Sequence, residues 1–250
     1  MAEYQKIQTL FKRDTKNVII PSMFTLPEFE YLKDCRWEAT EKIDGTNMRV
    51  ELLPVMNSDG SLKKVLYEFK GRTDKAQIPP HLMDKMYKLF DYDKLVRYFY
   101  PDTDGREYAP VTIYGEGYGM KIQKGGNYIK NDVDLILFDV RIGRWWLGRE
   151  ACENIAATLG IKIVPLIGYM TIPEAIDYVR KGFKSTIAEN PDYDAEGLVL
   201  KTPDGLLLRN GERIITKIKT CDFLKYKNVY GDSTVEQKIN PKYNLNENSN

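Results

Sequence analysis

The sequence predicts an α+β fold, because runs with strand character outnumber runs with helical spacing and follow one another across short turns. The chain has 250 residues, of which 42% are hydrophobic and 29% are charged. This composition is typical of a soluble globular protein, and the length suffices for one large core or two small ones. Without an internal repeat or a clear linker, we expect a single domain over residues 1–227. Residues 228–250, rich in Asn, Lys and Ser, predict a poorly ordered tail.

The expected strands are bounded by Gly, Pro and Asn turn signals. Strands are predicted over residues 37–40 and 48–52, on either side of Gly45, and over 65–69 after the hairpin turn at 57–60. Further strands are predicted over residues 111–114, 135–140, 197–200, 206–208 and 213–218. Because most neighbours in this series are joined by turns, the pattern favours antiparallel pairing.

Three helices are expected to cover the sheets. Apolar residues at helical spacing predict one helix over 84–99, and a second over 149–159 ends at Gly160. A third helix begins at Thr171, which forms a capping-box pattern with Glu174.

Composition excludes several classes of function. The 37 basic and 36 acidic residues nearly balance, so any nucleic acid must be bound by a local patch. Three widely spaced cysteines argue against a disulfide framework and favour a reducing compartment, and no apolar run approaches the ~18 residues of a membrane span. We therefore expect a cytoplasmic protein without a membrane partner. The only histidine, His81, excludes histidine-based triads, and a P-loop motif is absent.

Five short charged motifs occur in a fixed order along the chain. They are Glu41-Lys42-Ile43-Asp44-Gly45-Thr46-Asn47, Lys70-Gly71-Arg72-Thr73, Tyr114-Gly115-Glu116-Gly117, Glu196-Gly197-Leu198-Val199-Leu200-Lys201 and Lys217-Ile218-Lys219. A lysine two residues before Asp-Gly is common beside turns, but the ordered set is not. A lysine attacks phosphorus only when neutral, and its free pKa is ~10.4, so a nucleophilic lysine needs burial or nearby cations.

Each motif also has a structural interpretation. Lys217 and Lys219 lie on one strand face, where they either hold an anion such as a triphosphate or form a solvated strand edge. Arg72 can grip a phosphate or form a salt bridge. The glycines around Glu116 indicate close packing around a ligand or a flexible loop.

Phe138 and Asp139 end an apolar strand. A phenylalanine there is more often part of a core than a shelf for a base. A buried Asp139 needs a partner, and together with Glu196 it could hold a divalent metal through oxygen ligands.

The ordered motifs resemble those of the covalent nucleotidyltransferases, which include polynucleotide ligases and mRNA capping enzymes. The "DGTN" form with Asn47 is most similar to the RNA ligase 2 family, and the resemblance spans about residues 35–221. It implies an adenylation domain of two antiparallel β-sheets with flanking helices and an ATP cleft between them. Asp44 departs from the pattern, because RNA ligase 2 relatives often have His there, whereas DNA ligases and capping enzymes have Asp.

The resemblance implies three chemical steps. Lys42 attacks the α-phosphate of ATP to form lysyl-AMP, AMP passes to a 5′-phosphate, and a 3′-hydroxyl displaces AMP and seals the strand. The implied cofactors are ATP and Mg²⁺ or Mn²⁺. The implied catalytic residues are Lys42, Asp44, Lys217 and Lys219; the nucleotide-binding residues are Glu41, Ile43, Asn47, Arg72, Glu116, Phe138, Lys217 and Lys219; the metal ligands are Asp139 and Glu196.

Only 31 residues follow Lys219, so we expect no OB domain, which DNA ligases and capping enzymes append. The expected protein is a monomeric RNA ligase that acts on nicked duplexes or single-stranded ends. Two alternatives stay open. One is a minimal ATP-dependent DNA ligase, and the other is a non-catalytic module that binds nucleotides or RNA.

Overall fold

The computed structural model describes residues 3–101, 108–123 and 128–231, and it divides the chain into two compact units. Unit 1 comprises Met1–Gln5, Ile43–Pro165 and Thr186–Tyr193. Unit 2 comprises Lys6–Lys42, Leu166–Ser185 and Asp194–Asn250. Each unit is therefore assembled from segments that are distant in the sequence.

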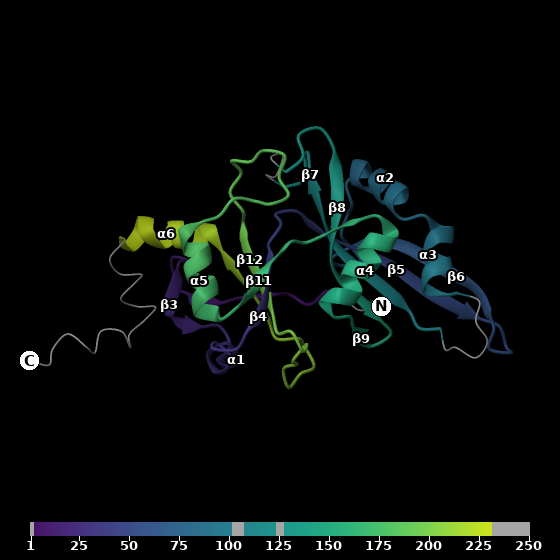
Figure 1. Cartoon of the computed structure of the whole chain (residues 1–250), viewed down its shortest axis with the longest axis horizontal. Helices are drawn as coiled ribbons and strands as arrows, with labels where there is room; N and C mark the ends of the chain where they lie inside the picture. Colours follow the sequence, from purple (N-terminus) through teal and green to yellow (C-terminus); the bar gives the residue numbers. More distant parts are fainter. Residues whose placement is uncertain (1–2, 102–107, 124–127, 232–250) are drawn as a thin grey trace, which may run out of the picture. The chain divides into compact units, whose positions relative to one another are not determined.

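Unit 1 is built on a six-stranded sheet with the order β10-β8-β7-β5-β6, with β9 paired to β8 (Figure 1). Its strands are β5 (Thr46–Met56), β6 (Leu62–Gly71), β7 (Val111–Gly119), β8 (Val133–Ile142), β9 (Trp145–Trp146) and β10 (Lys162–Ile163). All pairings are antiparallel except the short one between β10 and β8. The predicted hairpin between β5 and β6 is confirmed.

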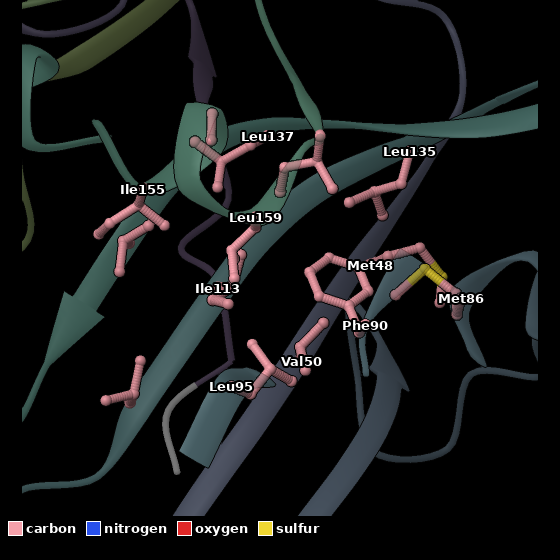
Figure 2. Packing of buried hydrophobic residues seen from close by; sticks show 14 of the residues in the cluster. Met48, Val50, Met86, Phe90, Leu95, Ile113, Leu135, Leu137, Ile155 and Leu159 are labelled. Carbon is pink, nitrogen blue, oxygen red and sulfur yellow. The ribbon is translucent and has the colours of Figure 1, made fainter. Parts of the chain in front are cut away.

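One face of this sheet carries the core of unit 1. Figure 2 shows Met48 and Val50 of β5 packed with Phe90 and Leu95. The helices on this side are α2 (Pro80–Leu89), α3 (Tyr92–Phe99) and α4 (Arg149–Leu159). Along a strand, alternate residues point to opposite faces, so Asn47, Arg49 and Glu51 lie on the other face. That polar face carries most of the site residues predicted in unit 1.

The single helix predicted over 84–99 is wrong, because the structure has two helices there. Asp91 ends the first helical run: its backbone is extended, and its side chain accepts a hydrogen bond from the Lys94 N–H at 2.8 Å. An aspartate that caps the next helix competes with continuation of the preceding one.

Unit 2 contains a five-stranded sheet with the order β1-β13-β12-β4-β11 and a small β2-β3 sheet (Figure 1). Its elements are β1 (Gln8–Thr9), β2 (Phe11–Arg13), β3 (Ile19–Phe24), α1 (Pro27–Tyr31), β4 (Trp37–Glu41), β11 (Leu166–Met170), α5 (Ile172–Lys181), β12 (Gly197–Lys201), β13 (Ile215–Lys219) and α6 (Thr220–Tyr230). Trp37 and Ala39 of β4 pack with Leu198 and Leu200 of β12 in its core. The capping box of Thr171 and Glu174 is confirmed at the start of α5.

The α+β class is confirmed, and several boundaries differ from prediction. Residues 206–208 do not form a strand; only an isolated bridge joins Leu207 to Arg213. The glycines around Glu116 belong to β7 rather than to a loop. Helix α6 was not predicted; it includes the first residues of the predicted tail, and 232–250 lie outside the described residues. Within the described ranges, no helix is long and apolar enough to cross a bilayer.

Candidate active site

Lys42 follows directly after β4, and its position is fixed by the neighbouring strand. Its backbone N–H donates to the Gly197 carbonyl at 2.9 Å, which continues the pairing of β4 with β12. Its ammonium forms an ion pair with the carboxylate of Glu196. The two side chains are 18% and 15% exposed, so this pair is largely shielded from water.

Glu196 also forms an ion pair with a second lysine, Lys219. Its other oxygen lies 2.6 Å from the ammonium of Lys219, at the end of β13. The register that pairs Gly197 with Lys219 places the residue before β12 beside this strand end, and the Thr220 N–H donates to the Glu196 carbonyl at 2.9 Å. Glu196 therefore bridges Lys42 and Lys219.

Gly197 permits this arrangement through its conformation. Its φ is +148°, and a Cβ there would lie 2.0 Å from the Ile218 carbonyl oxygen. Only glycine lets β12 approach β13 so closely at the point where Glu196 enters the strand.

Lys217 and Lys219 have opposite pKa shifts. Burial, followed by repulsion from Lys42 and Lys219, lowers the pKa of Lys217 below its usual value of 10.5, and the attraction of Glu196 offsets this only in part. Burial also acts to lower the pKa of Lys219, but its hydrogen bond and charge interaction with Glu196 outweigh burial and raise it. One carboxylate thus faces three lysines, which leaves excess positive charge suited to a phosphate group.

Glu41 lies on the core side of the same sheet, because residues alternate along β4. It is 1% exposed and accepts a hydrogen bond from the Ser185 hydroxyl at 2.5 Å. Sequence analysis did not identify Ser185, because a serine in an irregular segment carries no motif. The nucleotide-binding role of Glu41 stays a prediction.

The residues after Lys42 belong to unit 1 and are held against β7. Ile43 is 4% exposed in an apolar cluster that includes Tyr128, whose hydroxyl accepts from the Asp44 N–H at 3.2 Å. At Gly45, a Cβ would lie 2.3 Å from the Gly117 carbonyl oxygen. The predicted tight turn therefore packs directly on the glycine-rich strand.

Asn47 and Glu116 are register partners in β5 and β7. The side-chain oxygen of Asn47 is buried and lacks a hydrogen-bond partner among the described residues. A buried amide without a partner is costly, so this position is suited to a ligand that supplies one.

Phe138 and Asp139 of β8 contact Tyr4, which sequence analysis missed. Asp139 is 2% exposed and accepts a hydrogen bond from the Tyr4 hydroxyl at 2.5 Å. The rings of Tyr4 and Phe138 lie 5.0 Å apart, edge to face. The two partners are 135 residues apart in sequence, which explains why no local pattern revealed the contact.

Arg72 directly follows β6 and is exposed. The fully buried Arg49 holds its loop, donating to the Arg72 carbonyl at 3.4 Å and pairing with Asp74. Arg49 also lies 3.0 Å from Glu51. Buried charge therefore supports this loop, whereas Arg72 itself is exposed.

Carboxylate oxygens are the donors that Mg²⁺ and Mn²⁺ prefer, and Asp139 and Glu196 provide them. Within the described part of the chain, no three His, Cys, Asp or Glu side chains gather as a ready set of metal ligands. Glu196 is held by two lysines and Asp139 by Tyr4. The donor chemistry fits a divalent cation, and at Glu196 such a cation would replace a lysine ammonium.

A family model described as RNA ligase matches residues 36–219, the segment from just before β4 to the end of β13. No curated protein matches the chain significantly.

Solved structures of an RNA ligase from Naegleria gruberi are similar in fold. A lysine-to-alanine mutant with ATP and Mn has a TM-score of 0.57 at 18% identity, and the match covers 90% of this chain and 59% of the ligase. The same ligase with PPi has a TM-score of 0.55 at 18% identity, covering 91% of this chain and 60% of the ligase. A glutamate-to-alanine mutant with AMP and Mn has a TM-score of 0.53, with 18% identity and coverage of 90% and 60%. The chain thus spans about three fifths of the length of these ligases.

Proposed function

Because the chain belongs to the RNA ligase family, we propose that it joins RNA ends through a covalent lysyl-AMP intermediate. The observation that carries this proposal is the ion-pair chain from Lys42 through Glu196 to Lys219. This chain of ion pairs holds Lys42, Glu196 and Lys219 together on one sheet, which supports a nucleophile at Lys42 and phosphate binding at Lys219.

In the proposed reaction, the Lys42 nitrogen attacks the α-phosphorus of ATP. A nitrogen–phosphorus bond forms, the bond to the bridging oxygen breaks, and pyrophosphate leaves. Glu196 contacts the ammonium of Lys42 and is placed to receive its proton. Lys217 and Lys219 neutralise the phosphates, because an anion relieves the repulsion that lowers the Lys217 pKa.

The remaining roles follow from the family resemblance. Phe138 would provide a stacking surface for adenine, Glu116 would accept a ribose hydroxyl, and Arg72 would contact the nucleotide or the RNA end. Asp139 and Glu196 would offer oxygens to Mg²⁺ or Mn²⁺, which would neutralise charge during phosphoryl transfer. The Naegleria ligase structures with ATP and Mn, with AMP and Mn and with PPi support this choice of cofactors. We also propose that the protein is a monomer and that it is cytoplasmic. The three dispersed cysteines support the cytoplasmic location, because they favour a reducing compartment.

The lysyl-AMP step is tested by intact mass spectrometry. With ATP and Mg²⁺ or Mn²⁺, the mass of the protein should rise by one AMP, and the adduct should be absent in Lys42→Ala. Lys184→Ala is the matched control, because Lys184 is an exposed lysine of the same unit that pairs with Asp194. An adduct that persists in Lys42→Ala would rule out this nucleophile, and stronger labelling by GTP than by ATP would indicate capping chemistry.

The substrate is tested on nicked duplexes that differ only in their sugars. RNA presents 2′-hydroxyls that phosphate contacts alone do not recognise. We expect sealing to fall sharply when the strand with the 3′-hydroxyl becomes DNA, and less when the 5′-phosphate strand does. Equal rates on all-DNA and RNA-ended nicks would favour the DNA ligase alternative, and nucleotide binding without any adduct would favour a non-catalytic module.

A further inference from the structure

Tyr4 occupies the centre of an aromatic cluster on the polar face of the unit 1 sheet. It is 5% exposed, and its ring centroid lies 5.1 Å from that of Tyr114, 5.0 Å from Phe138 and 5.8 Å from Trp146. Its hydroxyl donates to Asp139 at 2.5 Å. One side chain therefore fixes both members of the Phe138-Asp139 pair.

The β-strand geometry explains how one residue can contact two consecutive side chains. Between β7 and β8 the register shifts, with Tyr114 opposite Asp139 and Gly115 opposite Leu137, so Phe138 is the extra residue of a β-bulge. In a regular strand, Phe138 and Asp139 would point to opposite faces, but a bulge redirects a side chain. Tyr4 packs where the bulge turns both side chains to one face.

The segment that carries Tyr4 has a second anchor on the same unit. Glu3 accepts a hydrogen bond from the Asp74 N–H at 3.3 Å, two residues beyond Arg72. The segment is therefore held at the loop after β6 as well as at β8. Two anchors on one unit restrict the conformations open to this segment and therefore those open to the Tyr4 ring.

We propose that Tyr4 is a positioning residue of the nucleotide site, holding the bulged Phe138 and Asp139 in the orientation that adenylation requires. This inference rests on the proposed ligase function. It assigns two separable tasks: the ring orients the adenine-stacking side chain, and the hydroxyl orients the carboxylate. Preorganised side chains raise rates because they need not be ordered during the reaction.

Two substitutions separate these tasks. Tyr4→Phe keeps the ring and removes only the donor to Asp139, whereas Tyr4→Leu removes both. Tyr100→Phe is the matched control. Tyr100 is a buried tyrosine of the same unit, 4% exposed, whose hydroxyl donates to the Leu52 and Ala109 carbonyls away from Phe138.

Two readouts are needed. The first is the single-turnover rate of AMP-adduct formation at saturating ATP. The second is the Kd for ATP, measured calorimetrically in the Lys42→Ala background, which cannot form the adduct. Tyr4→Phe should lower the rate about tenfold and leave Kd within about twofold, because the lost hydrogen bond orients the Asp139 carboxylate and does not contact the nucleotide. Tyr4→Leu should in addition raise Kd about tenfold.

Tyr100→Phe should leave both quantities within about twofold of wild type, although its unfolding midpoint should fall as much as that of Tyr4→Phe. The positioning role is overturned if either Tyr4 variant matches Tyr100→Phe in both quantities once its folding is verified by circular dichroism. If wild type forms no AMP adduct, the proposed ligase chemistry fails instead, and the Kd values still report whether Tyr4 orders the nucleotide site.

Discussion

The two units assemble their site residues in different ways. In unit 2, predicted residues contact one another directly, since Glu196 pairs with both Lys42 and Lys219. In unit 1, predicted residues are held by residues that no motif contains: Asp139 by Tyr4, and the Arg72 loop by Arg49. The charged residues predicted in unit 2 thus hold one another in place, whereas the residues predicted in unit 1 are held by buried residues outside the motifs.

This difference indicates where substitutions should reduce activity and where they should reduce stability. The carboxylate of unit 2 is shared by Lys42 and Lys219, whose side chains keep 18% and 30% of their surface exposed, so its loss should act mainly on chemistry. In unit 1, the side chains of Arg49 and Tyr4 are almost fully buried. Their loss should therefore act first on packing and on the orientation of neighbouring side chains.

The largest expected effect is at Glu196, which tests most directly whether the charged residues of unit 2 act on chemistry. Glu196→Ala leaves three lysines without their common counter-charge, and we expect the single-turnover rate of AMP-adduct formation to fall at least about hundredfold, or ~3 kcal/mol. Glu212→Ala is the control, an exposed glutamate of the same unit that accepts from Asn210. A rate within fivefold of wild type would show that the lysines do not need this carboxylate.

A smaller effect, on stability, is expected at Arg49 of unit 1. Arg49→Met leaves Glu51, which is 3% exposed, with Lys70 at 2.8 Å as its remaining cation. Breaking a buried ion pair is costly, so the free energy of unfolding in urea should fall by about 2–3 kcal/mol. Converting Glu51 to Leu in the same chain should recover most of the loss. If Arg49→Met lowered the free energy of unfolding by less than ~0.5 kcal/mol, the buried charge of unit 1 would not act mainly on stability, and the contrast with unit 2 would fail.

The smallest effect is a pH dependence at Lys217. Its lowered pKa means that Lys217 loses its proton at lower pH than an ordinary lysine, and with it the charge that attracts phosphate. Pyrophosphate affinity should therefore weaken by up to about tenfold as pH rises through the lowered pKa, below 10.5. Lys217→Arg stays charged and should give a flatter profile by calorimetry. Identical profiles for both proteins would exclude Lys217 as the titrating group.

Residues with a local signal were predicted well. Alternation along the strands predicted that Lys217 and Lys219 share a face, and a Gly-Leu-Val-Leu run predicted strand β12. Tyr4 and Ser185 gave no signal, because their partners Asp139 and Glu41 are 135 and 144 residues away. Such contacts depend on tertiary packing, which propensity and periodicity do not encode.

Two of the errors in secondary structure have different causes. The break between α2 and α3 had a local signal in Asp91, which the apolar spacing on both sides obscured. Helix α6 was missed because its last residues, from 228 on, have the polar composition of a tail. Packing of Phe223 and Tyr226 into the core and an ion pair between Asp222 and Arg13 help to stabilise the helix. The break at Asp91 could therefore be recognised from the sequence, whereas helix α6 could be recognised only from the fold.

The topology of the unit 2 sheet also bears on how the chain folds during synthesis. Strand β1 leaves the ribosome before the other strands of this sheet, but its partner is β13, more than two hundred residues later. Until β13 has emerged, both β1 and β12 lack a neighbour on that side, and unpaired strand edges promote aggregation of nascent chains. The strand that carries Lys217 and Lys219 is therefore also the one whose arrival completes the sheet.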